Sequence, residues 1–93
     1  MKEENELNAK IQKIILLEYY SRLHGQSKNP EMHFYNLPEL KEIDNQVIET
    51  NAIYLIDENF VRGGVDEEGE RKFPWITRLL PKGITFVEKL ITK

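Results

Sequence analysis

The 93 residues of this chain suffice for one domain with a single modest core. With 40% hydrophobic and 31% charged residues, the composition is that of a globular protein and excludes a disordered or fibrous one. The absence of cysteine excludes disulfides, thiolate catalysis and cysteine-ligated zinc. No apolar run is long enough to span a bilayer, and the acidic N-terminus lacks the hydrophobic stretch of a signal peptide. We therefore expect a cytoplasmic protein.

The first 24 residues predict a long helix over about 3–24. Hydrophobic side chains recur every four residues, and others widen this stripe: Leu7, Ile11, Ile15 and Tyr19, then Ile14, Leu16, Tyr20 and Leu23. Most of so broad a stripe is expected to face the core. The rest, at Ile14 and Tyr20, is a candidate homodimer contact. Gly25 stands where a C-terminal cap belongs.

Two further helices are predicted after a polar loop over 26–35. The first is short, over 36–43, because Asn36 can cap it and Glu39 can complete a capping box. The second spans about 45–59, with Asp44 or Asn45 as its cap. The periodicity places Ile48, Ala52 and Leu55 on the core side of this helix.

A β-hairpin and a closing helix complete the chain. Residues 60–65 and 70–79 predict two strands, and residues 66–69 predict the turn between them. Pro74 is expected at an edge or near the end of the pairing. A helix over 81–92 follows, with its inner stripe at Ile84, Val87, Leu90 and Ile91.

This order of elements resembles the winged-helix superfamily. Residues 54–63 (YLIDENFVRG) are similar to the end of a recognition helix that leads into the first wing strand. Residues 78–88 (RLLPKGITFVE) are similar to the second wing strand entering the closing helix. Within the superfamily the chain is similar to the small YjcQ-like proteins. One departure is Leu80, which stands where these domains usually have a threonine cap.

The resemblance implies an α+β winged helix over residues 1–93: a three-helix bundle, a two-stranded β-hairpin wing and a C-terminal helix. It also implies a non-catalytic, DNA-binding transcriptional regulator. On the helix over 45–59, the surface opposite the core carries Gln46, Glu49, Thr50, Ile53 and Asp57, with Tyr54 at its margin. We expect Gln46, Thr50, Ile53 and Tyr54 to make specific contacts, and Arg71, Lys72 and Arg78 to contact phosphates.

The charge of this surface favours an alternative, a protein-binding or dimerisation module that does not bind DNA. The whole chain has a net charge of −3, and residues 44–72 hold eight acids against three bases, a net of −5. Phosphate neutralisation supplies much of the affinity of DNA-binding proteins, so an acidic helix and wing count against a duplex. Ile53 and Tyr54 would suit a protein partner. Trp75 is expected to be buried against the helices, or else to lie in a dimer contact.

No pattern indicates an enzyme or a cofactor. Without cysteine, a zinc site would require His24, His33 and a carboxylate such as Glu31, and we expect no metal. The only glycine pair, Gly63-Gly64, lies in a predicted strand without the spacing of a phosphate-binding loop. The expected partners are therefore double-stranded DNA or another protein.

Overall fold

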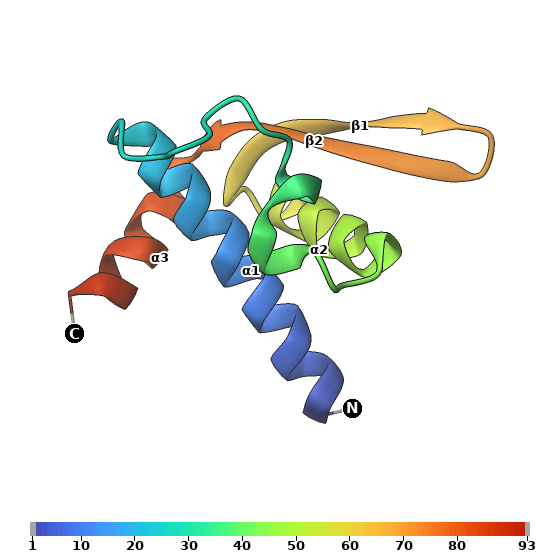
Figure 1. The fold of residues 1–93 in the computed structure, drawn as a ribbon, viewed down its shortest axis with the longest axis horizontal. Helices are drawn as coiled ribbons and strands as arrows, with labels where there is room; N and C mark the ends of the chain where they lie inside the picture. Colours follow the sequence, from blue (N-terminus) through green and yellow to red (C-terminus); the bar gives the residue numbers. More distant parts are fainter. Residues whose placement is uncertain (1, 93) are drawn as a thin grey trace.

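The computed structural model describes residues 2–92, and it confirms the α+β class. Three α-helices, two 3₁₀ turns and one antiparallel hairpin follow each other in the order α1, η1, η2, α2, β1, β2, α3. Figure 1 shows α1 running diagonally through the molecule, with α3 on one side, α2 on the other and the hairpin across the top. None of the helices within residues 2–92 is long and apolar enough to cross a bilayer.

Helix α1 spans Lys2–Leu23 and supplies the central part of the core. Its predicted stripe is confirmed, since Ile11, Ile15, Leu16 and Tyr19 are buried. Gly25 has a φ of +67°, and the Gln26 amide donates to the Ser21 carbonyl at 2.8 Å. This is the Schellman arrangement that glycine favours after a helix, so the predicted cap is confirmed.

The predicted short helix over 36–43 is wrong. Two 3₁₀ turns replace it, η1 (Phe34–Asn36) and η2 (Pro38–Leu40). Pro38 holds the preceding Leu37 in an extended conformation with ψ of 130°, which no helix starting at Asn36 could pass through. The buried residues Phe34, Leu37 and Leu40 recur every three positions, which matches the 3₁₀ repeat. The capping box is absent, and the His33 ring caps η1 instead.

Helix α2 spans Asn45–Asp57 and ends two residues earlier than predicted. The Asp44 carboxylate caps it by accepting a hydrogen bond from the Gln46 amide at 2.9 Å. The predicted core residues Ile48, Ala52 and Leu55 are all buried. Asn59, with a φ of +64°, ends the helix in a second Schellman arrangement, in which the Phe60 amide donates to the Leu55 carbonyl. The left-handed backbone conformation of Asn59 turns the chain from α2 toward the hairpin.

Strands β1 (Val61–Glu68) and β2 (Arg71–Leu79) form a longer hairpin than predicted. The predicted turn over 66–69 is wrong, because only Gly69 and Glu70 connect the strands. Gly69 has a φ of +64°, which suits the first position of a two-residue hairpin loop. The acidic run lies in the strand, where Glu67 stands opposite Lys72 and Glu68 opposite Arg71 in the ladder. Opposite charges in such positions favour the pairing of the strands.

Helix α3 spans Pro81–Ile91 and packs beneath the base of the hairpin. As expected from Leu80, no side chain caps its N-terminus. Val87 is fully buried and Ile84 packs against the core, but Ile91 is 54% exposed, so its predicted inner position is wrong. The last turn of α3 extends beyond the core that the other elements build (Figure 1).

Candidate binding surface on α2 and the hairpin

The structure brings together most of the residues that the sequence selected from α2 and the hairpin. Gln46, Thr50 and Ile53 line one open pocket of about 260 Å³ with Arg71 and Lys72. Glu49 and Glu70 line the same pocket, so its walls carry two carboxylates as well as two bases. The Thr50 hydroxyl donates to the Gln46 carbonyl at 2.9 Å, so its oxygen can only accept a hydrogen bond from a partner, whereas the Gln46 side-chain amide can both donate and accept.

Arg71 is exposed but already forms an ion pair within the protein. Its guanidinium lies 3.0 Å from the carboxylate of Glu49 and 5.1 Å from the centre of the Phe73 ring. Glu49, predicted on the exposed surface of α2, is only 7% exposed, so that prediction is wrong. A carboxylate in this position needs a cation, and Arg71 supplies it from the hairpin. Arg71 therefore couples the hairpin to α2 and is less available to a phosphate.

Tyr35 lies beside this ion pair, which the sequence did not reveal. Burial raises the pKa of the Tyr35 phenol well above its usual range, and the Glu49 carboxylate raises it further. The hydroxyl is buried without a hydrogen bond of normal geometry. Phenol, carboxylate and guanidinium thus join η1, α2 and β2 in one polar cluster under the pocket.

Tyr54 faces a different depression, of about 330 Å³, between α1 and α2. An amide network forms its base. Asn51, only 3% exposed, accepts a hydrogen bond from Gln12 at 2.8 Å and donates to Asn8 and to the Val47 carbonyl, both at 2.9 Å. The only signal of this network in the sequence is an asparagine adjoining the buried side of α2. It fixes α2 against α1 and so fixes the direction of the candidate surface.

An aromatic row continues from Tyr54. The Phe60 ring lies 6.4 Å from Tyr54 and 5.8 Å from Phe86, the latter in an edge-to-face arrangement. Tyr54 and Phe86 are exposed, and the Lys82 ammonium lies 4.5 Å above the Phe60 ring. These side chains come from α2, from the residue that precedes β1 and from α3, and together they form a partly apolar surface.

Arg78 is placed apart from the pocket, at the base of the hairpin directly opposite Arg62. Trp75 lies two pairs further along the ladder, opposite Gly64, and is 41% exposed. Its predicted burial against the helices is wrong, because its indole ring covers Gly64 instead. Arg62 was not selected from the sequence, because no strand pattern shows which residue will stand opposite another.

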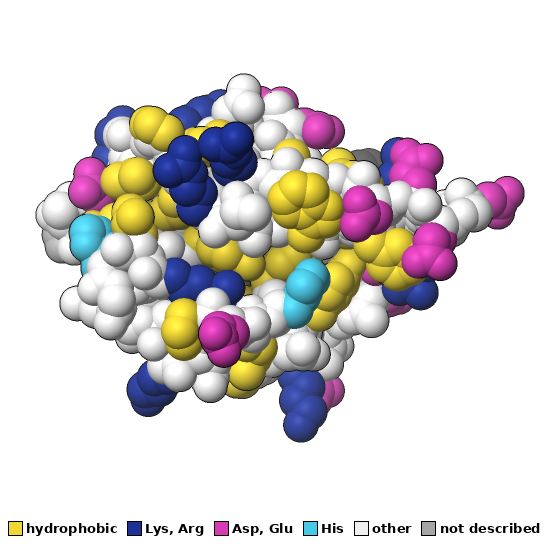
Figure 2. Space-filling view, turned by 90° about the horizontal axis from the view of Figure 1, so that it is seen from above, with side chains coloured by type: hydrophobic (Ala, Val, Ile, Leu, Met, Phe, Trp, Pro, Cys, Tyr) yellow, Lys and Arg dark blue, Asp and Glu magenta, His cyan; other side chains and the backbone are white. Residues whose placement is uncertain are grey.

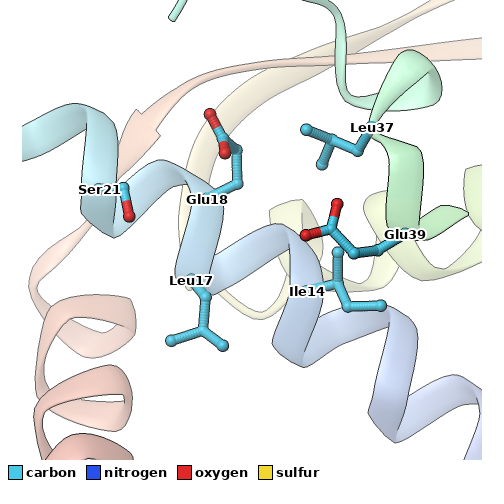
Figure 3. A pocket seen from close by; sticks show the side chains of 6 residues that line it. All are labelled: Ile14, Leu17, Glu18, Ser21, Leu37 and Glu39. Carbon is cyan, nitrogen blue, oxygen red and sulfur yellow. The ribbon is translucent and has the colours of Figure 1, made fainter. Parts of the chain in front are cut away.

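The other two candidate dimer residues both lie on α1. Ile14 packs partly on the core and lines a shallow pocket of about 180 Å³ with Leu37. Figure 3 shows the Glu18 and Glu39 carboxylates at the same pocket, where Glu18 also binds Arg22 and Ser27. Tyr20 packs partly on the core, with its ring 4.5 Å from that of His24. A homodimer contact through Ile14, Tyr20 and Trp75 stays a prediction.

The histidines have local roles. The His33 ring nitrogen Nδ1 accepts a hydrogen bond from the Tyr35 amide at 3.3 Å. Partial burial of the ring, and then the charge of Arg22, lower the pKa of His33. Within the part of the chain that the structure describes, no cluster of three or more histidine and acidic side chains could hold a metal ion.

Comparison with protein-family models, with curated proteins and with solved structures finds no match for this chain.

Proposed function

We propose that this chain is a winged-helix domain with no catalytic activity, and that it binds double-stranded DNA in gene regulation. In this proposal α2 is the recognition helix and the β1–β2 hairpin is the wing. The observation that carries the proposal is the shared pocket, where Gln46 and Thr50 of α2 face Lys72 of the hairpin. Such a surface combines side chains suited to base edges with a cation suited to a phosphate.

Two features limit the affinity expected of this surface. The region from α2 to the hairpin tip is acidic, and Arg71 is paired with Glu49 instead of being free for a phosphate. Acidic side chains gather at the projecting hairpin tip (Figure 2). Because carboxylates repel the DNA backbone, we expect weak binding that declines steeply as salt increases.

The second candidate function is protein binding, and the aromatic row favours it. Exposed aromatic side chains at the centre of a surface are typical of protein interfaces. Tyr54, Phe60 and Phe86 form such a centre, with the Lys82–Glu58 ion pair at its margin. In this alternative Ile53 and Tyr54 contact a partner protein, and α2 does not enter a groove of DNA.

The variant Glu49→Gln separates the two functions. It removes a carboxylate and releases Arg71, so duplex binding should become tighter by roughly threefold to tenfold if α2 and the hairpin contact phosphates. Lys72→Ala should weaken the same binding, whereas Lys89→Gln, on the last turn of α3, should leave it unchanged. Binding is measured by the anisotropy of a labelled mixed-sequence duplex at about 50 and 200 mM salt.

The outcome that contradicts DNA binding is the absence of a complex at the lower salt concentration, with wild-type protein and with Glu49→Gln. Protein binding then gains support if Tyr54→Asp abolishes the capture of one defined partner that the wild type retains. Circular dichroism establishes that each variant is folded.

A further inference from the structure

Two arginines stand opposite each other at the base of the hairpin. Arg62 and Arg78 are directly opposite in the ladder, and both are exposed. Like charges in this position destabilise an antiparallel pair. The ion pairs among the side chains of residues 4–92 involve Arg22, Arg71 and Lys82, and neither arginine of this pair takes part in one. An anion between the two guanidinium groups would relieve the repulsion.

A β-bulge brings Trp75 to the same face. The register shifts between Arg62 and Gly63, so Thr77 of β2 has no partner of its own in the ladder. The Thr77 hydroxyl donates to the Arg62 carbonyl at 3.0 Å and holds the bulge in place. Around it, Trp75, Thr77 and Arg78 are exposed, while Ile76 and Leu79 turn toward the core.

The indole of Trp75 is held in place by the opposite strand. A Cβ atom on Gly64 would lie 2.5 Å from Cζ2 and 2.9 Å from Cε2 of the ring. The ring therefore packs directly on the strand backbone, and the missing Cβ of glycine leaves room for it in this orientation. Because 41% of Trp75 remains exposed, part of the ring is available for stacking.

We propose that Arg62, Arg78 and Trp75 form a binding site for single-stranded nucleic acid. The two guanidinium groups bind a phosphodiester, for which their paired donors are suited, and the indole stacks on one base. The ligand is single-stranded because the bases of a duplex are already stacked on each other. This site lies on the outer face of the hairpin base and shares no residue with the pocket between α2 and the hairpin tip.

The distribution of charge supports this location. The strands carry Asp66, Glu67 and Glu68 toward the tip, which would repel a phosphate backbone. Figure 2 shows two Lys or Arg side chains next to each other among hydrophobic ones, on the half of this face away from the acidic tip. A strand of nucleic acid should thus cross the base of the hairpin and avoid its end.

The test uses the fluorescence of Trp75, which is the only tryptophan in the chain. A short oligothymidine strand is titrated into the full chain at low ionic strength, and saturable quenching is expected. Arg62→Gln and Arg78→Gln should each weaken this binding at least fivefold, and the double variant at least twentyfold. Lys89→Gln serves as the control of equal charge change and should bind as the wild type does.

Three results would overturn the proposal: no quenching by oligothymidine, unchanged binding by the double arginine variant, or equal quenching by inorganic phosphate alone. Trp75→Leu, followed by the anisotropy of a labelled strand, should bind at least fivefold more weakly than the wild type. Lys72→Ala distinguishes this site from the duplex-binding surface, since it should weaken the duplex complex and leave the oligothymidine complex unchanged. Urea unfolding establishes that the arginine variants are stable.

Discussion

The two adjacent glycines of β1 should respond to the same substitution to very different extents. A Cβ on Gly63 would meet backbone atoms of the opposite strand, lying 3.0 Å from the Trp75 carbonyl carbon and 3.1 Å from the Ile76 Cα, with the Trp75 carbonyl oxygen closer still. Backbone in a ladder cannot move away without loss of pairing. On Gly64, the obstacle is the Trp75 side chain, which can rotate.

We expect Gly63→Ala to cost about 2–3 kcal/mol, the upper part of the range for overpacking. A domain of 93 residues has roughly 5–14 kcal/mol of stability, so the variant should fold with a Tm lower by roughly 8–20 °C. Gly64→Ala should cost less than about 1 kcal/mol, because displacement of the ring is offset by the smaller conformational freedom of alanine in the unfolded chain. It should also shift the Trp75 emission to longer wavelength.

Urea unfolding, followed by far-ultraviolet circular dichroism, measures both free energies, and fluorescence measures the position of the indole. If Gly63→Ala were as stable as the wild type within about 0.5 kcal/mol, the close approach of the strands at the bulge would be refuted. If Gly64→Ala left the emission unchanged, the packing of Trp75 on the strand would be refuted, and with it the fixed stacking surface.

Further predictions concern the caps and the polar contacts. Asn59→Gly should stabilise the chain by about 0.5 kcal/mol in urea unfolding, because glycine adopts the left-handed conformation of this residue without strain; a loss of stability would contradict the assigned cap. Asn51→Ala should cost about 1–3 kcal/mol, since Gln12 and Asn8 lose a partly buried partner, whereas the exposed control Asn45→Ala should cost much less. The lowered pKa of His33 means that its contribution to stability is present above about pH 6.5 and lost as the pH falls through the lower folded-state pKa. The urea concentration at the unfolding midpoint should thus decrease as the pH is lowered from 7 to 5, and His33→Asn should make this decrease smaller. An equal decrease in both proteins would refute the role of His33. Tyr35→Phe should leave stability within about 0.5 kcal/mol of the wild type, because the buried hydroxyl makes no hydrogen bond of normal geometry, and a larger loss would show that its contact with Glu49 is stabilising.

The sequence by itself determined the features that depend on neighbours along the chain. The stripe of α1, the inner side of α2 and the caps at Asp44 and Gly25 all follow from spacing or from the conformational preference of one residue. Where such local rules competed, prediction failed. Asn36 and Glu39 form no capping box, because Pro38 restricts Leu37 to an extended conformation. The acidic run of β1 belongs to the strand, where it stands opposite basic residues that follow the turn.

Only the tertiary structure decided which polar side chains meet. Glu49 and Arg71 are 22 positions apart, and Asn8 and Asn51 are 43 apart, so no local periodicity relates them. The bulge at Thr77 likewise decided that Trp75 shares a face of the hairpin with Arg62 and Arg78, since one extra residue in a strand changes which side chains share a face. Helical spacing can show which side of an element is buried, but the partner of a buried charge or the neighbour of an exposed ring depends on how separate elements pack.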